Sequence, residues 1–104
     1  MRRQFYILLS QKNLSGYTTY GQFWLGYDRT VATEIFSQLK ESKKDPGQLM
    51  LHLDFMECVD EIPVKIKTIC CTLEDHAFNC NMIAKELFRT LTLEGNQPHL
   101  YKMR

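Results

Sequence analysis

Hydrophobic residues in this chain follow two different periods, and the change from one to the other happens twice in the same order. A two-residue alternation typical of strands gives way to helical spacing within residues 4–41, and again within residues 48–94. Each half is therefore expected to form two strands and one helix. Because 104 residues are too few for two independent cores, both halves are expected to share one core.

The first half is expected to be a hairpin followed by a helix. In residues 5–10, Phe5, Ile7 and Leu9 point to one face and Tyr6, Leu8 and Ser10 to the other. Residues 11–16 have turn composition, and residues 17–27 are rich in β-favouring aromatics and threonine. Asp28 is expected to cap the helix, and residues 42–47, which contain Pro and Gly, to end it. The apolar stripe of this helix comprises Val31, Ala32, Ile35, Phe36 and Leu39.

The second half repeats this order. Residues 48–59 alternate, residues 60–63 supply a turn, and residues 64–71 continue as an extended segment. Thr72 stands three residues before an acidic side chain, in an arrangement close to a capping box, and a helix is expected from there to about residue 93. Its predicted apolar stripe comprises Leu73, Ala77, Cys80, Ala84, Leu87, Phe88 and Leu91.

These elements predict an α+β domain, a four-stranded antiparallel sheet with two helices on one face, in the order ββαββα. Strand order is left open, since two hairpins joined side by side and a ferredoxin-like variant both satisfy the pattern. Residues 1–94 are expected to form the domain and residues 95–104 a flexible C-terminal tail. The predicted sheet core comprises Phe5, Ile7, Leu9, Phe23, Leu25, Leu51, Leu53, Phe55, Val64 and Ile66.

If both helices cover one face of the sheet, the other face is left uncovered. Aromatic residues and Met are enriched in the cores of interfaces, so this face is the candidate partner-binding surface and predicts a homodimer. A loop or the tail covering these side chains is the alternative, and Gly21 and Gly26 allow a bulge that changes which residues face outward. The candidate residues are Tyr6, Leu8, Tyr20, Trp24, His52, Asp54 and Met56, and alternation adds Lys65 and Lys67.

Cysteine and histidine gather around the start of the second helix. Thiolates and an imidazole are zinc ligands, but this set lacks a Cys-x-x-Cys pair and Cys80 lies within the apolar stripe. Free structural thiols are expected, with no metal and no cofactor. The residues in question are Cys70, Cys71, His76 and Cys80.

His52 and Asp54 are two residues apart on a predicted strand and therefore share a face, where a carboxylate can orient an imidazole for acid-base chemistry. Alternation places Glu57 on the opposite face. No phosphate-binding loop or nucleophile motif accompanies the pair, so surface polar residues are the favoured interpretation.

Charge and hydropathy exclude several classes of partner. Thirteen Lys and Arg against twelve Asp and Glu give a net charge of +1, which does not favour nucleic acid, although Lys65 and Lys67 beside aromatics resemble a single-strand platform. The N-terminal apolar run is too short for a secretory signal, and no stretch approaches a membrane span. A cytoplasmic protein without membrane contact is expected.

The sequence thus favours a non-enzymatic interaction module, homo-oligomeric through the uncovered sheet face. A domain that binds a small molecule or a peptide for regulation is the second hypothesis. A small enzyme that uses His52 and Asp54 is the third.

Overall fold

The chain folds in the predicted order ββαββα over the residues that the computed structural model describes, 3–42 and 51–93, with side chains described as far as Arg89. The elements are β1 (Arg3–Asn13), β2 (Gly16–Gly26), α1 (Arg29–Ser37), β3 (Leu51–Val59), β4 (Ile62–Cys71) and α2 (Leu73–Leu93). The predicted tail, 95–104, lies outside the described residues, as do the first three residues of the strand expected to begin at residue 48.

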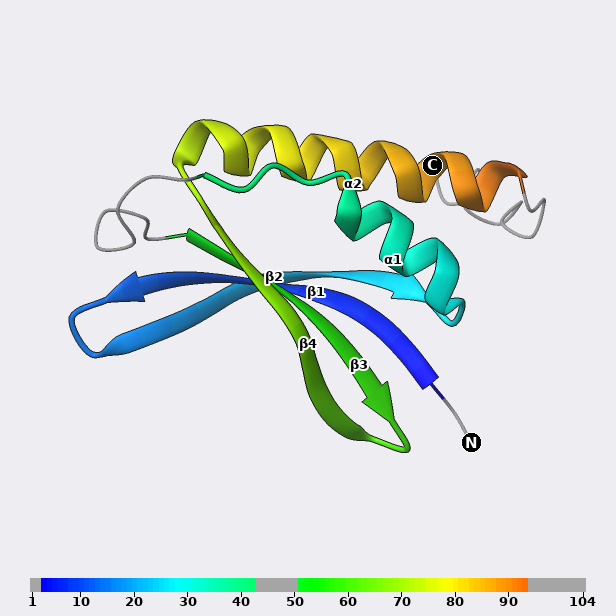
Figure 1. Ribbon diagram of the computed structural model, residues 1–104, viewed down its shortest axis with the longest axis horizontal. Coiled ribbons are helices and arrows are strands. Elements are labelled where there is room, and N and C mark those ends of the chain that lie inside the picture. The colour runs from blue at the N-terminus through cyan, green and yellow to red at the C-terminus, as the bar shows by residue number, and fades with distance from the viewer. Residues whose placement is uncertain (1–2, 43–50, 94–104) are drawn as a thin grey trace, which may run out of the picture.

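The four strands form one antiparallel sheet in the order β2-β1-β3-β4 (Figure 1). β1 and β3 occupy the centre because both carry apolar side chains on both faces, as in the run 5–9. The edge strands have compositions that a central position tolerates poorly. β4 contains Pro63, which lacks a backbone donor, and two lysines.

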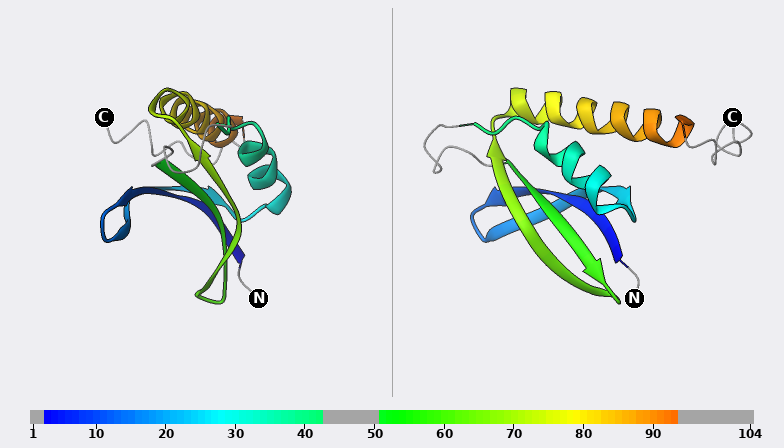
Figure 2. Two further views of the ribbon diagram at one scale, coloured as in Figure 1. Left: turned by 60° about the vertical axis from the view of Figure 1, so that its left-hand side comes forward. Right: turned by 45° about the vertical axis from the view of Figure 1, so that its right-hand side comes forward.

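Both helices cover the same face of the sheet, as predicted (Figures 1 and 2). The sheet residues that face them are the alternate positions of each strand, and the predicted core positions of β1, β2 and β3 all belong to this layer. Phe55 stacks on Phe36 of α1 with ring centroids 5.0 Å apart. The buried core comprises Phe5, Ile7, Leu9, Leu25, Ala32, Ile35, Phe36, Leu53, Phe55, Ile69, Cys71 and Ile83.

The prediction that Val64 and Ile66 belong to the core is wrong. Both side chains are exposed, because the far end of the β3–β4 hairpin projects beyond the layer of helices (Figure 1). Ile66 also occupies a bulge, since Phe55 pairs with Lys67 and Met56 with Lys65. Alternation identifies the faces of a strand but not how far along it the covering helices reach.

The start of α1 agrees with its sequence, and its end comes earlier than expected. The Asp28 carboxylate accepts hydrogen bonds from the backbone N–H groups of Thr30 and Val31, at 2.8 and 3.3 Å. The helix ends at Ser37, where the N–H of Gln38 donates to the carbonyl of Ile35 at 3.2 Å and tightens the last turn. Leu39 nevertheless packs against the core, so the predicted apolar stripe of this helix is confirmed.

A network of polar groups joins the start of α2 to the segment after α1. Thr72 caps the helix as predicted, because its hydroxyl accepts a hydrogen bond from the N–H of Asp75 at 3.2 Å. The carboxylate of Asp75 accepts from the Ser42 hydroxyl at 2.6 Å, and the same hydroxyl accepts from the N–H of Thr72 at 3.0 Å. Asn79 lies one turn further on and is fully buried.

The predicted apolar stripe of α2 is only partly correct. Among the described side chains of α2, Ile83 and Asn79 are buried, while Cys80 and Leu87 of the predicted stripe pack partly against the core. Leu73, Ala77, Ala84 and Phe88 of the predicted stripe are exposed, and the side chain of Leu91 lies outside the described ones. The apolar arc of α2 is therefore wider than the surface that the sheet and α1 cover.

Within 3–42 and 51–93, neither helix combines the length and apolar character that crossing a membrane requires.

Candidate functional site

The sheet face opposite the helices is built from the alternate positions that do not enter the core. Strand register aligns them in rows across the sheet, such as Trp24, Tyr6, Met56 and Lys65 from β2 to β4. In the described residues no helix lies on this side (Figure 2). We call this set the uncovered face, and it comprises Tyr6, Leu8, Ser10, Lys12, Tyr17, Thr19, Gln22, Trp24, His52, Asp54, Met56, Lys65, Thr68 and Cys70.

The apolar end of the uncovered face centres on Tyr6. Trp24 on one side of it is 44% exposed, whereas Met56 on the other side is 8% exposed. The Trp24 ring meets the ring of Tyr27 edge to face, with centroids 5.2 Å apart. Burial, and secondarily Cys58, raises the pKa of the Tyr6 phenol, so Tyr6 stays protonated near neutral pH. This end thus has an accessible aromatic edge at Trp24 and a buried side chain, Met56, on the other side of Tyr6.

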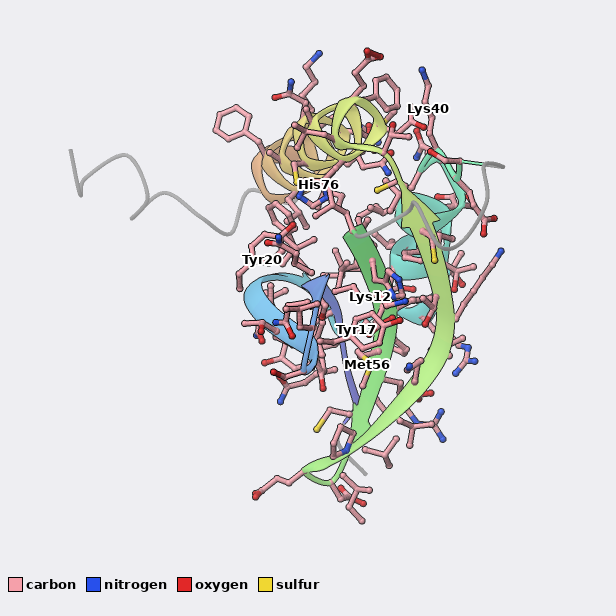
Figure 3. The ribbon with its side chains drawn as sticks, turned by 90° about the vertical axis from the view of Figure 1, so that its left-hand side faces the viewer. Lys12, Tyr17, Tyr20, Lys40, Met56 and His76 are labelled. Atoms are coloured by element: carbon pink, nitrogen blue, oxygen red, sulfur yellow. The ribbon has the colours of Figure 1, made fainter. Side chains whose placement is uncertain are left out.

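The polar end of the uncovered face is partly closed by its own side chains. The rings of Tyr17 on β2 and His52 on β3 approach to 4.6 Å between centroids, although β1 runs between these strands. Ser10 on β1 lies between Thr19 and His52, is buried, and shares a hydrogen bond of 3.2 Å with the hydroxyl of Thr19. Figure 3 shows Lys12 and Tyr17 beside this end.

His52 and Asp54 share the uncovered face as predicted, but each engages a different group. The Asp54 carboxylate accepts a hydrogen bond of 2.6 Å from the hydroxyl of Thr68, and the His52 ring packs on Tyr17. Among the described residues, no hydrogen bond joins the imidazole to the carboxylate. Glu57 lies on the helix-covered face as expected, where it pairs with Arg3 and Arg29 at 3.0 and 3.1 Å.

The prediction that Tyr20 belongs to the uncovered face is wrong. Ser10 pairs with Thr19 and Leu9 with Gly21, so Tyr20 occupies a bulge in β2 and turns to the helix side. Its hydroxyl lies 2.6 Å from Nε2 of His76 on α2 (Figure 3). The bulge near Gly21 that the sequence allows therefore exists, and it redirects Tyr20 while Trp24 keeps its predicted face. Lys67, which pairs with Phe55, also belongs to the helix side.

The cysteines near α2 divide between the two faces. Cys70 pairs with His52 on the uncovered face, and Cys71 is buried on the helix side, where burial raises the pKa of its thiol to about 11. Sγ of Cys80 lies 3.7 Å from Nε2 of His76. Within the described ranges, no group of three or more His, Cys, Asp or Glu side chains is placed to hold a metal ion.

The exposed side chains of the uncovered face that are absent from the predicted set include Lys12 and Tyr17. The sequence feature that could have assigned Lys12 and Tyr17 to this face is the turn between β1 and β2. Asn13 pairs with Gly16, which leaves a two-residue loop and sets Tyr17 directly opposite Lys12. Counting outward from that pair identifies both residues as members of the face that contains Ser10.

No family model, curated protein or solved structure matches this chain. The geometry of the uncovered face is therefore the ground for a functional proposal.

Proposed function

We propose that this domain is a non-enzymatic interaction module, and that the uncovered face binds an acidic, apolar-rich segment of another protein. The observation that supports this most is Trp24, which stands 44% exposed beside Tyr6 on a strand of a hydrogen-bonded sheet. Large aromatics held on a rigid scaffold give contact area at low cost in conformational entropy, and they are enriched among the residues that dominate binding energy.

Charge on the uncovered face favours an acidic partner. The ammonium groups of Lys12 and Lys65 belong to exposed residues at its two ends, whereas Asp54 is half-buried and accepts a hydrogen bond from Thr68. Glutamate or aspartate side chains on a bound segment would meet these lysines while apolar side chains cover Trp24 and Tyr6. Complementary charge of this kind raises association rates and selects against basic partners.

A polypeptide suits this surface better than a small molecule does. The cavity next to the apolar end, lined by Gln4, Cys58, Asp60 and Glu61, has a volume of about 230 Å³. Ligand pockets are typically larger, roughly 300 Å³ or more, and predominantly apolar. An enzyme that uses His52 and Asp54 has less support, because both side chains already engage other groups of the sheet.

The test uses two labelled peptides of about ten residues, the upper length of a typical strand. One carries Leu and Phe at alternate central positions and Glu at the same-side positions near both ends, so that all of them point to one side of the extended peptide, and the other has Lys in place of every Glu. We expect the acidic peptide to bind by fluorescence anisotropy and Trp24→Ser to weaken it at least tenfold, the usual loss for a central aromatic contact of about 2 kcal/mol. Thr33→Ser, at an exposed position of α1, is the control and should leave the affinity unchanged.

Other outcomes would count against the proposal. Preference for the basic peptide or for single-stranded RNA would assign the face to a different class of partner. Equal binding by the Trp24 and Thr33 variants would place the peptide elsewhere on the domain. Self-association lost on Trp24→Ser would instead identify the uncovered face as a homodimer interface.

A further inference from the structure

Helix α2 carries a second apolar surface that neither the sheet nor α1 covers. Leu73 is 75% exposed and Phe88 is 61% exposed, and the exposed Ala77 and Ala84 lie between them on the same side of the helix. We call these four residues the outer stripe. It borders the buried side of α2, where Cys80 and Leu87 pack against the core.

The spacing within the outer stripe is the same in both directions along the helix. Its members are four, seven and four residues apart. The two outer members have large side chains, and the two inner members are alanines. A two-fold axis through the middle of α2 therefore superposes this pattern on its own reverse. Isologous interfaces require self-complementarity of this kind, in which residue i meets residue j and j meets i.

We propose that a second copy of this chain docks on the outer stripe, with the two α2 helices antiparallel. Leu73 then meets Phe88 of the second copy, and Ala77 meets Ala84 of the second copy. The alanines let the helix backbones approach closely, and each leucine and phenylalanine pair covers one end of the contact.

Charges beside the outer stripe agree with the antiparallel arrangement. Glu74 and Lys85 are both exposed and lie on the same flank of α2, near opposite ends. Antiparallel pairing sets the carboxylate of Glu74 beside the ammonium group of Lys85 of the second copy, and the symmetry makes this contact twice. A parallel pairing would instead place the two Glu74 side chains at the same level on opposite flanks, far from Lys85 of the other copy, and lose this complementarity.

The dimensions predict a weak, reversible dimer. From Leu73 to Phe88 the stripe extends about 22 Å at 1.5 Å per residue, shorter than the contact of a standard stable interface. A dissociation constant on the order of 10 µM is expected for so small a contact. Because α2 and the uncovered face lie on opposite sides of the sheet, pairing through α2 leaves both uncovered faces free (Figure 2).

Charge reversal tests the geometry in the full chain by analytical ultracentrifugation. Glu74→Lys and Lys85→Glu should each weaken the dimer about tenfold or more, because each creates two like-charge contacts. The double variant restores both contacts with their signs exchanged, so we expect its dissociation constant to return to within about threefold of the wild type. Failure of the double variant to recover, with both single variants weakened, would overturn the antiparallel register.

A second variant tests the stripe without relying on charge pairing. Ala84→Arg introduces a bulky side chain at the closest approach but stays exposed in the monomer, so we expect a monomer with an unchanged circular dichroism spectrum. Thr33→Arg on α1 has the same added charge and should remain dimeric. A monomeric wild type at several hundred micromolar, or a dimer that survives Ala84→Arg, would refute the proposal. Peptide binding by the uncovered face is measured separately and is expected to persist in Ala84→Arg.

Discussion

Asn79 is a polar residue at the centre of the packing side of α2, and its position has a clear physical reason. Its amide donates to the carbonyl of Lys40 at 3.0 Å and accepts from the N–H of Lys40 at 2.8 Å. The segment after α1 therefore satisfies backbone groups through one buried side chain rather than through secondary structure. Helical spacing of apolar residues gives no signal for such a position, which explains why the predicted stripe of α2 was centred on the wrong side.

Replacing Asn79 with Ala should lower the free energy of unfolding by about 2 to 4 kcal/mol, because both Lys40 backbone groups lose their partner. Asn81→Ala, at an exposed position two residues along the same helix, serves as the matched control and should change it by less than about 0.5 kcal/mol. Urea denaturation measures both values. Equal stability of the two variants would show that the amide bridge contributes nothing.

His76 should make the domain sensitive to mild acid. Burial lowers the pKa of this imidazole from 6.5, and Nδ1 is buried without a hydrogen-bond partner among the described residues, while Nε2 faces Tyr20 and Cys80. The folded state therefore binds fewer protons than the unfolded state. The neutral His76 side chain contributes to stability at pH values above the unfolded pKa of 6.5. That contribution is lost as pH falls through the lower folded pKa.

We expect the urea midpoint of the wild type to fall between pH 7 and pH 5, and His76→Gln to reduce that dependence. The variant keeps a polar group near Tyr20 but has no proton to gain. Tyr20→Phe removes the hydroxyl and preserves the imidazole, so the pH dependence should persist in it. An identical pH dependence in wild type and His76→Gln would contradict this role.

At the scale of elements, the β3–β4 hairpin contains backbone strain that its sequence does not relieve. Asp60 and Glu61 form its two-residue turn with φ of +51° and +71°, both in the left-handed region that favours Gly or Asn. Turns of this type occur widely with Asn-Gly, since glycine has no Cβ to clash with the backbone. Glu61 therefore costs the folded state some stability.

Glu61→Gly should raise the free energy of unfolding by about 1 kcal/mol, the approximate cost of a left-handed residue that has a Cβ. Glu61→Ala removes the charge but keeps the Cβ, so it should show no such gain. Thermal denaturation at one pH compares the three proteins. A gain in the alanine variant as large as that in the glycine variant would mean that charge, rather than backbone conformation, determines the effect.

At the scale of the whole molecule, local periodicity predicted the layers of this fold well and its surfaces less well. Alternation assigned Tyr6 and Leu8 to the correct face because β1 pairs with β3 without a register shift, and Trp24 keeps its predicted face between two bulges of β2. It failed at Tyr20, where a bulge in an edge strand shifts the register by one residue. The prediction that Val64 is buried failed for another reason. How far the helices extend over the sheet depends on long-range packing, which local alternation does not report.

The two proposed surfaces together describe a bivalent module. The outer stripe of α2 pairs two copies, and each copy keeps an uncovered face for a partner. Two linked faces bind a partner with two matching segments more tightly than one face does, because the second contact forms at high effective concentration. This gain should disappear in Ala84→Arg while single-segment binding remains.

The fluorescence of Trp24 during titration with the acidic peptide tests the central claim most directly, since it is the only tryptophan in the chain and lies on the uncovered face. Binding there should shift its emission to shorter wavelength, protect it from acrylamide quenching, and weaken as salt screens Lys12 and Lys65. If the labelled peptide binds by anisotropy while the emission and quenching of Trp24 stay unchanged, the uncovered face is not the binding surface.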